Sequence, residues 1–343
     1  MSVEEFIEEW NNDSEYVEVN TSGSTGEPKR MMVEKRRMLA SARITCDFLG
    51  LKPGSTALLC MSTDYIAGKM MVVRSIERGL KLTTVEPSGH PLKNCPLGSS
   101  KNNCQLSIVN CQFDFSAMVP LQVYNSLQVP EERERLKQIR HLIIGGGAID
   151  DALAAELRDF PNNIWSTYGM TETLSHIALR RLNGPEASEW YTPFPSVQLS
   201  LTDEGCLVIN APEVCPTPLI TNDIAELSTV NCQLSTCKFR ILGRKDNVIC
   251  SGGIKIQAEE VERQLKPHMR VPFIVSKRAD EKFGEIVVLL TEGSPDEART
   301  ICERILPKFH RPRLYLHIDQ IPLTATSKPA RQKIKDIVSG AKT

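Results

Sequence analysis

The chain has 343 residues, of which 41% are hydrophobic, and its formal net charge at pH 7 is −1. This length is sufficient for two domains with sizeable cores, and the near-zero charge gives no indication of a nucleic-acid partner. The sequence contains no run of 18 apolar residues, so we expect no membrane span. Residues 1–5 are acidic, whereas a signal peptide begins with basic residues, so we expect a cytoplasmic protein.

The eleven cysteines are odd in number and scattered along the chain. Cys232 and Cys237 have four residues between them, but no second pair of metal ligands lies near them in the sequence. We therefore expect reduced thiols rather than disulfides or a metal cluster.

The first half of the chain alternates apolar runs with amphipathic stretches. We predict helices over residues 4–10, 35–49, 66–78 and 131–140, and strands over residues 16–19, 56–61, 82–85, 112–119 and 141–144. Residues 87–112 are rich in Pro, Gly, Ser and Asn and are expected to form loops, with a short strand near residues 106–109. Strands that alternate with helices indicate an α/β fold with a largely parallel sheet.

The second half changes character after residue 190. Residues 196–201 and 206–209 flank Thr202-Asp203-Glu204-Gly205, which is typical of a hairpin turn, and further short strands indicate an antiparallel β subdomain over about residues 191–242. Beyond it we predict helices over residues 257–265 and 295–306, and strands over residues 271–275, 285–290 and 315–318. The chain is thus expected to form a larger domain over residues 1–242 and a small α+β domain over residues 243–343.

Residues 20–29 have the most unusual local composition. Six of the ten are Thr, Ser or Gly, and Lys29 ends the run. Glycines let backbone N–H groups converge, hydroxyls add donors and the lysine adds a positive charge, a combination that binds phosphate. The spacing is not that of a Walker A loop. Considered alone, the stretch is equally compatible with a polar surface turn.

Five further stretches carry suitable chemistry. Gly145-Gly146-Gly147-Ala148 follows a predicted strand, where glycines allow close approach of a ligand. Residues 165–173 offer an aromatic ring for stacking, a hydroxyl for phosphate and a carboxylate for Mg²⁺. Residues 221–223 and 243–256 then lie in and after the β subdomain, and residues 322–331 lie near the C-terminus. Considered singly, each is also compatible with an ordinary turn, a charged linker or a tail.

In this order, the stretches resemble the adenylate-forming superfamily of acyl-CoA synthetases, luciferases and peptide-synthetase adenylation domains. The resemblance implies that Tyr168 stacks on adenine, Asp223 binds the ribose, Thr171 reaches the α-phosphate and Glu172 is the Mg²⁺ ligand. Lys328 would join Thr171 and Glu172 as a catalytic residue. The implied nucleotide-binding residues are Thr21, Ser22, Gly23, Ser24, Thr25, Gly26, Lys29, Gly145, Gly146, Gly147, Ala148, Ser166, Thr167, Tyr168, Gly169, Met170, Asp223 and Arg244.

The family's reaction has two halves. A carboxylate attacks the α-phosphorus of Mg·ATP and releases pyrophosphate, and a thiol, normally that of coenzyme A, then takes the acyl group. The resemblance implies a mobile C-terminal domain with a hinge at residues 243–247, centred on Asp246. Asn222 and Ser327 replace usual glycines, and Asn247 replaces an Asp often found there. Only about twenty residues precede the phosphate loop, far fewer than in most members, so we expect a shortened first subdomain.

Residues 61–80 bear on which carboxylic acid would be the substrate. A glycine followed by Lys69 and Arg74 on one predicted helix is similar to the o-succinylbenzoate–CoA ligase branch, which serves menaquinone biosynthesis. That substrate has a second carboxylate, for which Lys69 and Arg74 are candidate partners. Residues i and i+5 lie about 140° apart around a helix, so we expect one cation to dominate. Two solvated cations are the alternative interpretation.

Other functions stay open at this point. The same motifs suit another aryl- or acyl-CoA ligase, an adenylation enzyme that loads a carrier protein, or a non-catalytic nucleotide-binding protein. The expected partners are a small carboxylic acid, ATP and coenzyme A, and a homodimer is also left open. His176 follows residues 165–173, the signature segment, and is interpreted as a structural histidine rather than a substrate contact.

Overall fold

The computed structural model describes residues 1–20, 30–93, 95, 113–147, 149, 151–228, 237–324 and 329–341. Within these ranges, no helix combines the length and the apolar character that crossing a membrane requires. The strand expected near residues 106–109 lies outside the described residues.

A mixed, largely parallel sheet organises the part of the chain between residues 56 and 193. In the described residues it has seven strands, in the order β4-β3-β5-β6-β7-β8-β9. Neighbours from β4 to β7 are parallel, whereas β8 and β9 add antiparallel pairs. This confirms the parallel sheet predicted from alternating strands and helices. The strands are β3 (Thr56–Leu59), β4 (Lys81–Thr84), β5 (Phe113–Met118), β6 (Ile139–Ile144), β7 (Asn163–Gly169), β8 (His176–Arg181) and β9 (Thr192–Pro193).

Helices cover both faces of this sheet. Successive strand residues point to opposite faces, so Leu59 and Ile143 join one buried core while Leu58 and Ile144 join another. The first core also takes residues of α1 (Val3–Trp10), α2 (Lys35–Phe48) and α3 (Ile66–Arg78). The second takes residues of α4 (Pro120–Leu127), α5 (Pro130–Lys137) and α6 (Asp151–Leu157).

Two antiparallel sheets lie against the first core. β1 (Tyr16–Asn20) pairs with β2 (Arg30–Glu34), so these strands flank residues 21–29. In the described chain, four further strands form a sheet in the order β10-β11-β12-β13, with every neighbouring pair antiparallel. It confirms the predicted antiparallel strands. The strands are β10 (Gln198–Leu201), β11 (Cys206–Asn210), β12 (Leu219–Leu227) and β13 (Phe239–Arg244).

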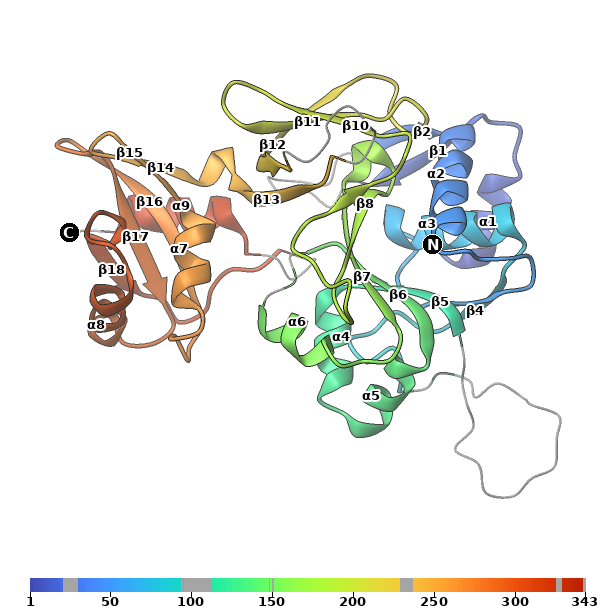
Figure 1. Cartoon of the computed structure of the whole chain (residues 1–343), viewed down its shortest axis with the longest axis horizontal. Helices are drawn as coiled ribbons and strands as arrows, with labels where there is room; N and C mark the ends of the chain where they lie inside the picture. The colour runs from blue at the N-terminus through green and yellow to red at the C-terminus, as the bar shows by residue number, and fades with distance from the viewer. Residues whose placement is uncertain are drawn as a thin grey trace.

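The C-terminal elements, coloured orange to red, gather at one end of the molecule in Figure 1. Among the residues described there, five strands form one sheet, and two cores contain only residues between 249 and 338. The sequence analysis missed β14, β15 and α9. The elements are β14 (Val248–Ser251), β15 (Ile254–Gln257), α7 (Ala258–Leu265), β16 (Phe273–Asp280), β17 (Gly284–Thr291), α8 (Pro295–Ile305), β18 (Leu314–His317) and α9 (Arg331–Gly340).

Candidate active site

The signature segment forms a tight turn between β7 and β8. β7 ends at Gly169, a 3-10 helix spans Thr171–Thr173, and β8 begins at His176. A Cβ atom on Gly169 would lie 2.2 Å from the carbonyl oxygen of Ser175, so a larger residue does not fit. Leu174 has a φ of 65°, a left-handed conformation that is uncommon for a non-glycine residue. The backbone of the turn is therefore closely constrained.

Thr171 and Glu172 present their side chains on the outer part of this turn. Glu172 is exposed and Thr171 is half-buried, and none of the described residues forms an ion pair with Glu172. Thr173 is buried, and its Oγ1 holds the turn through the backbone of Met170 and Ser175. A free carboxylate suits Mg²⁺. No group of three or more potential metal ligands occurs in the described ranges.

Tyr168 and Asp223 are brought together from separate sheets. The Tyr168 hydroxyl donates to Asp223 Oδ2 at 2.7 Å, and burial, reinforced by the Asp223 charge, raises the pKa of Tyr168. Asp223 Oδ1 accepts from Arg244 at 3.3 Å. Arg244 also donates to Asp246 Oδ2 at 2.9 Å, and Asn222 donates to the same oxygen at 3.4 Å. One hydrogen-bonded chain therefore joins four of the predicted residues.

The glycine segment lies at the carboxyl end of β6, beside the carboxyl end of β7. The Gly145 N–H donates to Met118 O at 3.0 Å, and a Cβ on Gly145 would lie 2.5 Å from Thr167 Oγ1. Gly146 has a φ of 81° and Gly147 continues the turn. The structure therefore places these glycines next to the strand that leads into the signature turn, the edge of a parallel sheet where ligands bind.

Two of the neighbours of Tyr168 were missed by the sequence analysis. The Tyr168 ring packs edge-on against Phe239 at 5.1 Å and lies 5.8 Å from the ring of Tyr191. Ser166 Oγ is 2.9 Å from the Tyr191 hydroxyl. Tyr191 and Phe239 are paired through an isolated β-bridge, and no motif in the sequence marks that pairing. Ser166 therefore supports the aromatic cluster, while Gly169 and Met170 form the turn itself.

Lys69 is buried and fully engaged. Its side chain leaves α3, its Nζ donates to Glu18 O at 2.7 Å and pairs with Glu9 at 3.2 Å, and it lies 5.0 Å from the ring centre of Phe6. Glu9 in turn accepts from the Glu18 N–H at 3.2 Å. Lys69 therefore ties α1 and β1 to α3. This arrangement leaves Lys69 without the free charge expected of a substrate-binding cation.

Arg74, on the same helix, has a different environment. It is 2% exposed, and its Nη2 donates to Ser175 Oγ at 2.7 Å. Its Nε is buried without a hydrogen-bond partner, and no carboxylate in the described parts of the chain pairs with it. Burial lowers the pKa of Arg74 to about 10. Among the described residues, Arg74 is thus a buried cation without a counter-ion, and it contacts the end of the signature turn through Ser175.

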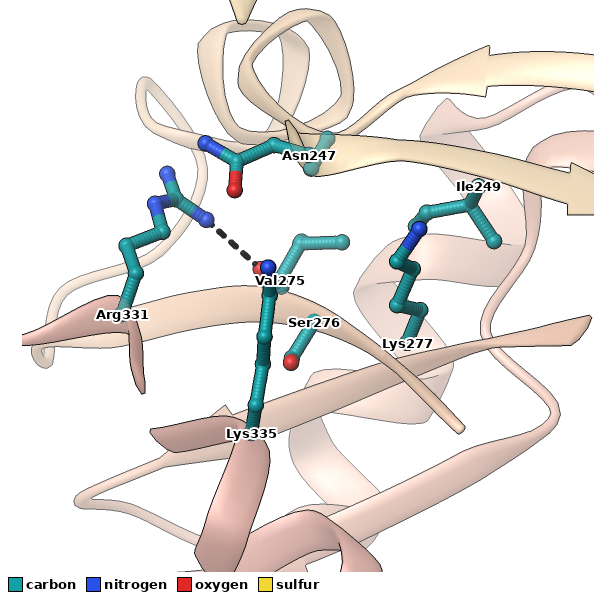
Figure 2. A pocket seen from close by; sticks show the side chains of 8 residues that line it. Asn247, Ile249, Val275, Ser276, Lys277, Arg331 and Lys335 are labelled. Atoms are coloured by element: carbon teal, nitrogen blue, oxygen red, sulfur yellow. Dashed lines mark hydrogen bonds between the residues drawn. The ribbon is translucent and has the colours of Figure 1, made fainter. Parts of the chain in front are cut away.

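The predicted hinge residue, Asp246, has partners on both sides. Its carboxylate faces Arg244 of β13, whereas its backbone oxygen accepts from Lys335 of α9 at 3.1 Å. Lys277 of β16 donates to Val248 O at 2.7 Å. Figure 2 shows Lys277 and Lys335 reaching toward the start of β14, around a small cavity. Two lysines therefore attach the backbone at Asp246 and Val248 to β16 and α9.

Arg331 anchors the start of α9 in the same place. It donates to Val275 O at 2.8 Å, the bond drawn as a dashed line in Figure 2, and it pairs with Glu262 at 2.8 Å. The sequence analysis matched Arg331 to a family motif but did not predict the helix that it begins. The helix that follows residues 325–328 is thus fastened to β16 and α7.

Several predicted residues lie outside the described residues: Thr21, Ser22, Gly23, Ser24, Thr25, Gly26, Lys29, Ala148 and Lys328. The described ends of their segments have defined places. Asn20 bridges to Tyr65 at the start of α3, and Leu323 bridges to Pro329 on either side of residues 325–328. The roles of these residues stay predictions.

Residues 7–214 match the sequence profile of the AMP-binding enzyme family. A 2-succinylbenzoate–CoA ligase of Listeria monocytogenes serotype 4b (strain F2365) is 26% identical over 339 residues, which cover 92% of this chain and 68% of the relative.

Two solved structures are also similar. An acyl-CoA synthetase (AMP-forming)/AMP-acid ligase II-like protein from Dyadobacter fermentans superposes with a TM-score of 0.63 at 31% identity, covering 96% of this chain and 91% of that one. The o-succinylbenzoate coenzyme A synthetase of Bacillus subtilis, solved with ATP and a magnesium ion, gives a TM-score of 0.72 at 22% identity, covering 92% and 69% respectively.

Proposed function

Because this chain belongs to the AMP-binding enzyme family, as an AMP-forming acyl-CoA ligase, we propose that it activates a dicarboxylic acid as an acyl-adenylate and transfers the acyl group to coenzyme A. The proposed acid is o-succinylbenzoate, and the reaction would serve menaquinone biosynthesis. The similarity to 2-succinylbenzoate–CoA ligases supports this choice, and one feature of the site carries it.

That feature is the buried charge of Arg74. Burying a cation without a partner is costly, so such a group persists where a ligand supplies the opposite charge. Arg74 contacts Ser175, which lies three residues after Glu172 in the signature turn. An acid bound beside that turn could present one carboxylate for activation and the other to Arg74. Lys69 is already paired with Glu9, so we assign the dominant role to Arg74.

In the first half of the reaction, residues of the turn would hold the nucleotide. Asp223 would accept hydrogen bonds from the ribose, beside Tyr168, and the Thr171 hydroxyl would donate to the α-phosphate. Glu172 would hold Mg²⁺, which supplies neutralisation of phosphate charge when bound. The substrate carboxylate oxygen forms a bond to the α-phosphorus while the bond to pyrophosphate breaks. Lys328 would stabilise the charge that develops there.

In the second half, the thiol attacks the acyl carbon, loses its proton and displaces AMP. We propose that residues 243–343 act as a separate domain that rotates about Asp246 between the halves, a domain-closure mode of switching. The contacts of Asp246 support this place for the pivot: its carboxylate is held by β13 and its backbone oxygen by α9. The larger domain would comprise residues 1–242.

A panel of carboxylic acids in ATP–pyrophosphate exchange tests the proposal. We expect exchange with o-succinylbenzoate and weak exchange with its monocarboxylate analogues. Release of AMP with coenzyme A as the sole thiol would separate a CoA ligase from an enzyme that loads a carrier protein. A preference for monocarboxylates would overturn the dicarboxylate assignment, and absence of exchange with every acid would overturn the catalytic one.

A further inference from the structure

A chain of buried and partly buried hydrogen bonds runs from Arg74 through Ser175, at the end of the signature turn. Arg74 Nη2 donates to Ser175 Oγ at 2.7 Å, and Ser175 Oγ lies 3.2 Å from His176 Nδ1. His176 Nε2 lies 3.1 Å from Thr45 Oγ1, and the Thr45 hydroxyl donates to Ser41 O at 3.1 Å. The chain therefore connects α3, β8 and α2, and both ring nitrogens of His176 have partners.

The direction of every bond follows from the two ends. Ser41 contributes a carbonyl, which can only accept, so the single proton of the Thr45 hydroxyl points to it. Thr45 must then accept from His176, which places the ring proton on Nε2. A neutral imidazole has one N–H, so Nδ1 accepts from the Ser175 hydroxyl. Ser175 Oγ is left to accept from Arg74, which can only donate.

These hydrogen-bond directions also require the His176 ring to be uncharged. A protonated ring would donate at both nitrogens, and Ser175 could no longer donate to Nδ1. It would also add a second cation beside Arg74. The ring of Phe194 also lies near the imidazole, with the two ring centres 5.6 Å apart. Burial, together with the charge of Arg74, lowers the pKa of His176 well below its usual value.

We infer that Ser175 and His176 are positioning residues, which aim the Arg74 guanidinium at the second carboxylate of the substrate, with Thr45 setting the tautomer of His176. The inference rests on the proposed function, because it needs a carboxylate at Arg74. Holding one Nη2–H on Ser175 orients the planar guanidinium, and its Nε–H, which is buried without a partner, remains for the ligand. A bidentate contact with a carboxylate needs such a fixed plane.

Kinetics with two acids separate positioning from folding. Ser175→Ala should raise the KM for o-succinylbenzoate about 10-fold, the low end for a charge-assisted hydrogen bond, and leave the monocarboxylate KM and the ATP KM within about twofold. Ser175→Thr, which keeps the hydroxyl, should restore most of the loss. Ser75→Ala is the matched control, because the Ser75 hydroxyl is also on the Arg74 helix but donates only to Met71 O.

The state of His176 gives an independent readout. Nitrogen-detected NMR of the enzyme without substrate should show a neutral His176 ring with its proton on Nε2. Thr45→Val should move that proton to Nδ1 and raise the dicarboxylate KM about threefold, whereas Thr45→Ser should do neither.

Three results would overturn the inference: a charged or Nδ1-protonated His176 in the unaltered enzyme, equal losses for both acids in Ser175→Ala, or no loss for either acid in that variant. If the unaltered enzyme does not prefer the dicarboxylate, the proposed function fails instead, and the positioning role fails with it. If the preference exists and depends on Arg74 but not on Ser175, the proposed function stands and the positioning role is wrong.

Discussion

Arg74→Met should make the protein more stable and less able to use its acid. The guanidinium is fully buried, and its pKa of about 10 reflects the unfavourable transfer of the charge from water. Each pKa unit corresponds to about 1.4 kcal/mol, so a lowering from the usual value of about 12.5 corresponds to about 3 kcal/mol. The sign is clear: at pH 7 Arg74 is charged in both states, and the folded state bears the cost.

Part of that gain is offset by contacts that the methionine cannot make. Arg74 donates to Ser175, a bond worth about 1 kcal/mol net, and it lies 6.0 Å from the ring centre of Phe115, a contact worth about 0.5–1 kcal/mol. We therefore expect Arg74→Met to stabilise the fold by about 1–2 kcal/mol, a rise of roughly 2–4 °C in the melting temperature. Active-site groups commonly reduce stability in this way.

The assay compares melting temperatures with and without the dicarboxylate. A ligand at about 100 times its Kd stabilises a protein by about 2.7 kcal/mol. A substitution that weakens binding about 10–100-fold, the value of a lost charged contact, leaves a ligand stabilisation of about 0.4–1.4 kcal/mol. Without the acid, the variant should thus have a higher melting temperature than the unaltered enzyme. When the acid is added to both proteins, that difference should disappear. The KM for the dicarboxylate should rise about 10–100-fold, with little change for a monocarboxylate.

Lys69→Met supplies the matched control on the same helix. Lys69 is equally buried but pairs with Glu9 and Glu18 O, so its removal leaves the partly buried Glu9 carboxylate without its cation and should lower the melting temperature. Both acids should then be affected alike. If Arg74→Met also melts lower and both acids lose equally, Arg74 is structural and the reasoning from its unpaired charge is refuted.

Four further predictions concern the nucleotide, the hinge and pH. Lys328→Ala should slow acyl-adenylate formation roughly 10²–10³-fold but spare thioester formation from presynthesised adenylate; equal losses in both halves would make Lys328 structural. Glu172→Gln should weaken Mg²⁺-dependent turnover and Asp223→Ala should raise the KM for ATP; unchanged kinetics would remove that residue from the site. Lys335→Ala, which frees the Asp246 backbone oxygen, should change the thioester step more than adenylation, and the opposite pattern in single-turnover assays would contradict it. Burial lowers the pKa of His141 to about 4, so on acidification the unfolded chain takes up a proton before the folded protein does. The free energy of unfolding should therefore fall from about pH 6.5 toward pH 4. In His141→Gln, urea midpoints measured over the same pH range should fall less steeply than in the unaltered protein.

Much of the fold and the chemistry of the site could be predicted from residue order. Strands alternating with helices indicate a parallel sheet because a parallel pair needs a crossover connection, and β3 to β7 form that sheet. The signature turn could be found because its roles need particular residue types, an aromatic ring, a hydroxyl and a carboxylate, within a few positions. Residue type alone could not explain why position 169 is a glycine. Any larger side chain there would collide with Ser175 across the turn, a contact that only the structure shows.

Short elements of the C-terminal part could not be predicted. β14 and β15 have four residues each and are joined by Gly252 and Gly253, both with positive φ. Such strands are too short to show a clear periodic pattern, and their hydrogen bonds come from a partner strand. α9 has only two buried residues, Ile334 and Val338, so its stability depends on packing against β16.

The roles of the two cations depended on tertiary structure alone. Lys69 and Arg74 lie five positions apart on one helix, and the sequence could say only that they point in different directions. Which one is neutralised depends on Glu9, a residue of α1 that reaches Lys69 through the fold. Arg74 instead turns toward Ser175 and the first core. A charge is paired or unpaired according to the groups within a few ångströms of it, and those groups come from distant parts of the chain.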